Sequence, residues 1–196
     1  MASLGKSPTV NPARRKVYAG RILELNWAEP PTTYETRSSG PDARMSVASE
    51  LLSPEDILLD LDVTSKKLVF EAVARLFERR HGLQRQQVEE SLAARERLGS
   101  TGLGQGVAIP HARIKHLPRA MAAFVRMKMP IPFEAPDAKP VSEILVLLVP
   151  EKATERHLQI LADFAQMFAD RGLREQIRAC ESAQALHRLF CDWTVP

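Results

Sequence analysis

A run of closely spaced glycines before His111 constrains the fold of this chain more than any other part of its sequence. Four of the nine glycines in the chain fall within eight positions, and they are Gly99, Gly102, Gly104 and Gly106. Glycine adopts positive φ angles without strain and lets a ligand approach the backbone closely, and successive N–H groups in such a loop can form a concavity that binds anions. The segment then passes through the apolar stretch 107–109 and ends on Pro110 and His111. This pattern predicts a loop that presents a histidine beside a site for an anion.

The residue types around His111 favour a phosphoryl group as that anion. An unperturbed histidine has a pKa of about 6.5, so its ring is mostly neutral and nucleophilic near neutral pH. Phosphoryl transfer requires mainly positioning and stabilisation of the phosphate oxygens, which the planar guanidinium groups of Arg95 and Arg113 match well. We therefore expect His111 to carry the phosphoryl group. The expected phosphate-binding residues are Ser100, Thr101, Gly102, Gly104, Gly106 and Arg113.

Other ligands of a glycine-rich loop fit this sequence poorly. A P-loop requires Lys and then Ser or Thr after its last glycine, whereas Gln105 and Gly106 follow Gly104 here. A dinucleotide fingerprint has the spacing G-x-G-x-x-G, whereas this chain has G-x-G-x-G. His116 could form a metal pair with His111, but no cluster of cysteines or carboxylates completes a site. We expect no metal and no cofactor.

Two further residues have roles that their spacing leaves open. His157 stands near the start of a predicted helix that Thr154 would cap, where the positive end of the helix dipole disfavours a charged imidazolium. A neutral ring there could donate a hydrogen bond to His111 or to its phosphate, and plain packing fits the spacing equally well. Leu103 stands between two glycines, where exposure to a partner protein and inward packing are equally consistent with the sequence.

Hydrophobic periodicity predicts strands and helices that alternate after residue 45. Alternation predicts strands at 57–63 and at 125–129, the latter with Met129 on its covered face, and the apolar run 144–149 is typical of a central strand. Helical spacing predicts helices that begin after Thr64 or Ser65 and end at Gly82, then at 84–96, 154–170 and 186–193. In the helix predicted at 154–170, Leu158 belongs to the expected buried face, and Gly172 is expected to end the helix. A short strand up to about residue 113 follows the glycines. These elements predict an α/β fold with a mixed β-sheet sandwiched by helices.

The first 44 residues differ in composition from the rest of the chain. They carry seven basic and four acidic residues, whereas residues 45–196 carry twenty of each, so the formal net charge of +3 lies in this segment. They show no sustained apolar periodicity, and such a segment cannot bury enough apolar surface to offset its ordering entropy. We expect residues 1–44 to be a disordered N-terminal extension, Met45 to be the actual translation start, and 45–196 to form one folded domain.

The sequence favours a cytoplasmic protein with no direct membrane insertion. Its longest purely apolar run, 144–149, has six residues, far fewer than the roughly 20 of a membrane helix. No signal-peptide core follows Met1. Cys180 and Cys191 match neither a disulfide framework nor a metal-site spacing. A nucleic-acid partner would have to bind the basic residues 1–44 alone, and we expect none.

Three segments resemble the IIA components of the bacterial phosphoenolpyruvate-dependent phosphotransferase system, in the mannitol/fructose and nitrogen-regulatory branch. They are LGSTGLGQGVAIPHAR (98–113), PIPFEAPDAKPVSEILVLLVPE (130–151) and HLQILADFAQMF (157–168). Upstream, LLDLDVTSKKLVFEAVARLF (58–77) resembles the family's first strand and helix, and its Ser65-Lys66-Lys67 is similar to the nitrogen-regulatory members. The resemblance covers about residues 46–193 and implies the mannitol/fructose-type IIA fold.

This resemblance implies a site and a donor. The family's phosphorylated histidine falls on His111, as a tele-phosphohistidine, and its other active-site residues fall on Arg95 and His157. The implied donor is a phosphohistidine carrier of the HPr type, and the implied activity is that of a phosphotransferase component with no small-molecule turnover of its own. Pro132 and Ala138 depart from the family's acidic residue and glycine, which puts details of partner recognition in doubt.

The resemblance also implies a regulatory role. Nitrogen-regulatory members signal nitrogen, potassium and carbon status through their phosphorylation state, with targets such as sensor kinases or potassium transporters. The alternative is a sugar-uptake IIA component that passes the phosphoryl group to a IIB domain of the fructose or mannitol type. A nucleic-acid-binding adaptor that uses the basic residues 1–44 is a third and weaker alternative.

Overall fold

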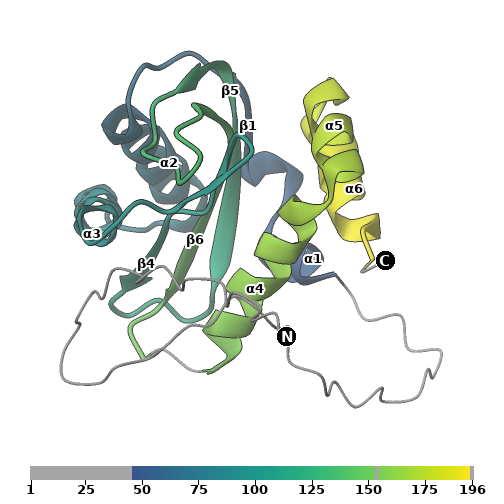
Figure 1. The fold of residues 1–196 in the computed structure, drawn as a ribbon. Coiled ribbons are helices and arrows are strands. Elements are labelled where there is room, and N and C mark those ends of the chain that lie inside the picture. Colours follow the sequence, from purple (N-terminus) through teal and green to yellow (C-terminus); the bar gives the residue numbers. More distant parts are fainter. Residues whose placement is uncertain (1–45, 153–154, 195–196) are drawn as a thin grey trace, which may run out of the picture. The chain divides into compact units, whose positions relative to one another are not determined.

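The computed structural model describes residues 46–152 and 155–194 of the 196-residue chain. The predictions for residues 1–44, Met45 and the Thr154 cap lie outside these described residues. The predicted alternation of strands and helices is not observed: β1 is followed by two helices, then by five strands in succession, and the described part ends with three helices (Figure 1). The bounds of the elements are α1 Val47–Leu51, a 3-10 turn Pro54–Asp56, β1 Ile57–Leu61, α2 Lys66–His81, α3 Arg85–Arg97, β2 Gly102–Gly104, β3 Val107–Ala108, β4 His111–Ile114, β5 Met121–Ile131, β6 Val141–Pro150, α4 Glu155–Ala169, α5 Arg171–Ala179 and α6 Ala183–Asp192.

The strands form a six-stranded mixed sheet, which confirms the predicted fold class. Its order is β1-β5-β6-β3-β2, and β4 also pairs with β6. The pairs β5–β6 and β2–β3 are antiparallel, whereas β1–β5, β3–β6 and β4–β6 are parallel. β3 and β4 follow one another along the edge of β6 that faces away from β5, because Val107 lies opposite Glu143 and His111 lies opposite Leu147. His111 therefore starts a strand beside the second half of the central strand.

Two hydrophobic cores lie on the two faces of this sheet, and β6 contributes to both. Side chains alternate between the faces of a strand, so Ile144, Val146 and Leu148 pack with α2 and α3. Leu145 and Leu147 pack with α4, α5 and α6 on the opposite face. All five side chains are fully buried, as the continuous apolar run predicted. Figure 1 shows the two helical layers on either side of the strands.

The helix signals in the sequence were correct for α2 and incomplete for the C-terminal region. Ser65 caps α2 by accepting a hydrogen bond from the Leu68 N–H, and Gly82, with φ of 68°, ends it. The prediction that Gly172 ends the helix over 154–170 was wrong. Asp170 caps a separate helix, α5, by accepting from the Leu173 N–H, and Gly172 lies within its first turn. The separate helix buries Leu173 and Ile177, a spacing of four residues.

One strand also departs from its predicted pattern. β5 has 11 residues and is longer than the predicted 125–129. The prediction missed residues 121–125 because they are buried on both faces and show no polar alternation. Met129 was expected on the covered face, but it is 65% exposed. The pairing of β5 with β6 is irregular between Arg126 and Ile131, which disturbs the alternation at this end of the strand. None of the helices in the described part of the chain is both long and apolar enough to cross a membrane.

Candidate functional site

His111 is held at the start of β4 by the backbone on both sides of it. The preceding residue, Pro110, has a carbonyl that accepts a hydrogen bond from the Leu147 N–H at 2.9 Å. β4 then pairs with β6 from His111 onward. The proline ring fixes the φ angle of the residue immediately before the histidine. The imidazole ring therefore extends into the site from a stiff backbone.

Two hydrogen bonds orient the His111 ring. Nδ1 lies 3.0 Å from the Ile109 carbonyl oxygen, and the Arg95 Nε–H donates to Nε2 at 3.1 Å. A carbonyl can only accept and a guanidinium can only donate. Both bonds form together in the neutral ring with its proton on Nδ1 and its lone pair on Nε2. The geometry therefore leaves the lone pair of the neutral ring on Nε2.

The surroundings of His111 also hold the ring neutral. Burial lowers the pKa of His111 below its usual value, and the charge of the Arg95 guanidinium acts in the same direction. The bond to the Ile109 carbonyl and the charge of Glu96 act in the opposite direction and offset only part of the shift. A neutral imidazole can use its lone pair to attack an electrophile. A guanidinium beside that lone pair can then contact the negative oxygens of the electrophile.

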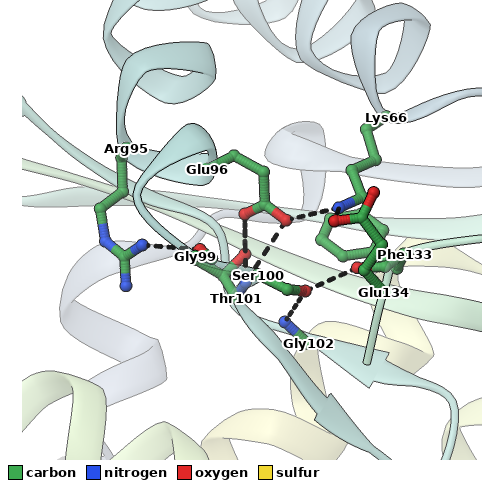
Figure 2. A network of polar contacts seen from close by, with 9 residues as sticks. All are labelled: Lys66, Arg95, Glu96, Gly99, Ser100, Thr101, Gly102, Phe133 and Glu134. Atoms are coloured by element: carbon green, nitrogen blue, oxygen red, sulfur yellow. Dashed lines mark hydrogen bonds and ion pairs between the residues drawn. The ribbon is translucent and has the colours of Figure 1, made fainter. Parts of the chain in front are cut away.

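Arg95 reaches His111 from the last turn of α3. Its Nη1–H donates to the Gly99 carbonyl at 3.0 Å, one turn further along the chain (Figure 2). This bond ties the Arg95 side chain to the backbone two residues beyond the end of α3. Arg95 thus holds the start of the following loop and contacts the His111 ring with the same side chain.

An open cavity of about 740 Å³ lies over His111. It brings together four of the sequence-predicted site residues, Arg95, His111, Arg113 and His157. His157 is the third residue of α4, so the helix on the opposite layer contributes to the same cavity as α3. The other lining residues are Ser91, Ala94, Leu98, Ala112, Leu147, Val149, Glu155, Leu158 and Leu161.

The glycine-rich segment builds a hairpin, and several of its polar groups form hydrogen bonds with other segments of the protein. The Ser100 hydroxyl donates to the Phe133 carbonyl at 2.6 Å, and the Thr101 hydroxyl donates to Glu96 at 2.6 Å. The Gly102 N–H donates to the Ser100 Oγ at 3.1 Å (Figure 2). A Cβ at Gly102 would lie only 2.8 Å from that of Ala135, which explains the glycine there.

The remaining glycines form the turn between β2 and β3. Gly104 and Gly106 have φ of 90° and 84°, which favour glycine. The Gln105 N–H between them donates to the Asp137 carboxylate at 2.8 Å, and the Gly106 carbonyl accepts from two N–H groups at the start of β6. The structure thus places Ser100, Thr101, Gly102, Gly104 and Gly106 outside the lining of the cavity. The two hydroxyls, the Gly102 N–H and the Gly106 carbonyl have other partners.

Sequence reasoning missed the apolar rim of the cavity. Leu98 is 76% exposed and Leu158 is 70% exposed, although Leu158 was assigned to the buried stripe of its helix. α4 buries instead the neighbouring face with Ile160 and Phe164. Of the two alternatives for Leu103, the structure favours exposure, since this side chain is 45% exposed. Leu103 does not line the cavity. Exposed leucines beside a cavity indicate a surface for a partner, and only a structure shows that they are exposed.

Two further histidines, His81 and His187, have structural partners. His81 at the end of α2 contacts Asp56 at 2.9 Å, and His187 on α6 contacts the Leu52 carbonyl at 2.9 Å. Within residues 46–152 and 155–194, no group of three or more His, Cys, Asp or Glu side chains could hold a metal ion.

The sequence of the folded part assigns this mixed-sheet protein to a known class. The chain is a member of the family described as the phosphoenolpyruvate-dependent sugar phosphotransferase system, EIIA 2, whose model matches residues 50–192. Within that class it is similar to a nitrogen regulatory protein from Pseudomonas aeruginosa, with 39% identity over 144 residues that cover 73% of this chain and 94% of the relative.

Solved structures agree with this assignment. The crystal structure of the nitrogen regulatory protein IIA-Ntr from Neisseria meningitidis is 46% identical, has a TM-score of 0.70, and the match covers 74% of this chain and 99% of that one. The mannitol IIA structure from Escherichia coli, at 17% identity and a TM-score of 0.61 over 71% of this chain and 98% of that one, supports the fold alone. The resemblance to the nitrogen-regulatory IIA proteins that the sequence predicted is confirmed.

Proposed function

We propose that this protein is a cytoplasmic phosphocarrier that accepts a phosphoryl group on Nε2 of His111 from an HPr-type phosphohistidine carrier. One observation carries the proposal: the Nδ1–Ile109 and Arg95–Nε2 hydrogen bonds leave the lone pair of a neutral ring on Nε2, and His111 lines an open cavity. This lone pair can attack once Arg95 releases it, and the ring need not lose a proton because Nδ1 already holds it.

The transfer step balances with these groups alone. The Nε2 lone pair forms a bond to phosphorus while the bond between phosphorus and the carrier's nitrogen breaks, and that nitrogen keeps the electron pair. Arg95 releases Nε2 as the new bond forms, and its N–H groups donate to the phosphoryl oxygens. His157 and Arg113 line the same cavity, which supports the proposal that they contact those oxygens.

We further propose that the phosphorylation state of His111 is a signal for nitrogen, potassium or carbon status. A phosphoryl group adds about −1.5 to −2 charges at neutral pH. Here the charge would appear in a cavity whose rim carries exposed leucines, so it would change which proteins bind there. Sensor kinases and potassium transporters are the classes of target that we propose. The similarity to nitrogen regulatory proteins over 94% of a relative's length supports this role over sugar uptake.

The test is phosphoryl uptake with labelled phosphoenolpyruvate, enzyme I and the carrier. We expect acid-labile, base-stable label on the wild-type protein and none on His111→Ala. His116→Asn is the matched control, because His116 is an exposed histidine with φ of 60° five residues further on, and asparagine tolerates that angle. Label that persists in His111→Ala would overturn the proposal. Rapid loss of label to an added IIB domain, with no effect on a regulatory target, would favour the sugar-uptake alternative.

A further inference from the structure

Glu96, the residue after Arg95, holds the backbone that carries the site. Its side chain is only 9% exposed and accepts hydrogen bonds from two other segments. The Thr101 Oγ1–H and N–H donate to Oε2 at 2.6 and 3.1 Å, and the Lys66 ammonium donates to Oε1 at 2.8 Å (Figure 2). The carboxylate therefore joins the end of α3 to the loop after it and to the start of α2.

From Thr101 the hydrogen bonds continue to the His111 ring. The Thr101 carbonyl accepts from the Ile109 N–H at 3.0 Å, and the Ile109 carbonyl faces His111 Nδ1 at 3.0 Å. The backbone of Ile109, through its N–H and its carbonyl, thus connects the segment fixed by Glu96 to the bond that keeps the proton on Nδ1. Displacement of Thr101 would move the Ile109 carbonyl and weaken the preference for the reactive tautomer.

Lys66 makes this arrangement possible for a nearly buried carboxylate. Burying a charge is costly unless it is paired and hydrogen-bonded. Lys66, 19% exposed, supplies the opposite charge, and its ammonium lies 4.7 Å from the centre of the Phe133 ring. The Phe133 carbonyl in turn accepts from Ser100, so the loop is fixed from both sides.

We propose that Glu96, supported by Lys66 and acting through Thr101, is a positioning residue for phosphoryl transfer, which fixes the Nδ1–H tautomer of His111. The inference rests on the proposed function only for its kinetic part. The tautomer is a property of the unphosphorylated protein and can be measured without any donor.

The test compares substitutions along this route. Thr101→Val removes the hydroxyl while keeping the shape of the side chain, Thr101→Ser retains the hydroxyl, and Glu96→Gln removes the charge. Glu89→Gln is the matched control, because Glu89 lies on the same helix and pairs only with its neighbour Arg85 among the ion pairs of the described residues. For each protein, ¹⁵N shifts of the His111 ring above its pKa give the tautomer, thermal unfolding gives the stability, and labelled phosphoenolpyruvate gives the rate of phosphoryl uptake.

We expect the wild-type protein, Thr101→Ser and Glu89→Gln to keep the proton on Nδ1. Thr101→Val and Glu96→Gln should shift the ring toward a mixture of tautomers and slow uptake about tenfold in protein that is fully folded. Loss of thermal stability with an unchanged tautomer and rate would overturn the inference and make Glu96 a purely structural residue. Failure of the proposed function would appear differently, as label on His111→Ala, and would leave the tautomer measurement valid.

Discussion

At His111, burial and the charge of Arg95 together favour the neutral ring, so the pKa of this side chain lies below its usual value of about 6.5. We expect its ring resonances to titrate with a midpoint below that value. Phosphoryl uptake should therefore keep its plateau rate as the pH falls to about 6.5 and decline only in more acidic buffer. Arg95→Gln should move the midpoint upward, because the substitution removes a charge that opposes protonation. A wild-type midpoint above the usual value would contradict the described environment.

The same lowered pKa affects stability, with a definite sign. In the unfolded chain the histidine keeps its usual pKa, so as the pH falls the unfolded state binds this proton first. The shift has no effect on the free energy of unfolding well above pH 6.5 and reduces it progressively below about pH 6.5. We expect the free energy of unfolding, measured with urea, to fall more between about pH 7.5 and about pH 5.5 for the wild-type protein than for His111→Gln. Equal losses would mean that the folded protein does not oppose protonation of this ring.

At the scale of the elements, one ion pair fixes the glycine hairpin against α5. Glu143 on β6 has a side chain that is 1% exposed, and Arg178 on α5 donates to both its oxygens, at 2.8 and 3.2 Å. Arg178 also donates to the Gln105 carbonyl in the turn between β2 and β3, at 3.1 Å. A Cβ at Gly106 would lie 3.3 Å from both charged groups, so this pairing also requires the glycine.

Removal of Arg178 should therefore destabilise the protein. Arg178→Ala leaves a buried carboxylate without its partner, which costs about 3–5 kcal/mol for a fully buried pair, and we expect about 2–3 kcal/mol because Arg178 is half exposed. Arg171→Ala on the same helix removes an exposed pair with Glu175 and should cost less than about 0.5 kcal/mol. Urea unfolding measures both. Equal costs for the two substitutions would show that Glu143 is not held by Arg178.

The elements that the sequence predicted well are those whose signals are local. The continuous apolar run of β6 and the caps of α2 depend on neighbouring residues, and the structure has both. α5 was missed because Gly172 was read as a helix end, while the Asp170 cap two residues earlier starts a new helix. The partners of the glycine loop could not be predicted, since Phe133 and Asp137 lie more than thirty residues from the groups they bind.

Across the whole folded part of the molecule, the site lies where the two helical layers meet at one edge of the sheet. α3 packs on one face of the sheet and α4 on the other, yet both line the cavity over His111. β4 pairs only with β6 among the described strands, so its other edge is uncovered by the sheet. A partner protein can therefore reach His111 without separating either hydrophobic core.

This arrangement predicts where the proposed phosphohistidine carrier docks. Leu98 at the end of α3 and Leu158 at the start of α4 flank the cavity and are 76% and 70% exposed. Leu98→Asp and Leu158→Asp should each raise the KM for the carrier about tenfold, because apolar anchors at the centre of an interface contribute most of its binding energy. Thermal stability should change little, since neither side chain is buried.

Met129→Asp is the matched control, because Met129 is 65% exposed but does not line the cavity. Leu103→Asp tests the hairpin as an alternative docking surface, because Leu103 is exposed on β2. Steady-state uptake measured against the concentration of the carrier separates these surfaces. If Leu103→Asp raises the KM while Leu98→Asp and Leu158→Asp leave it unchanged, the carrier reaches His111 over the glycine hairpin, and the leucines beside the cavity do not form its docking surface.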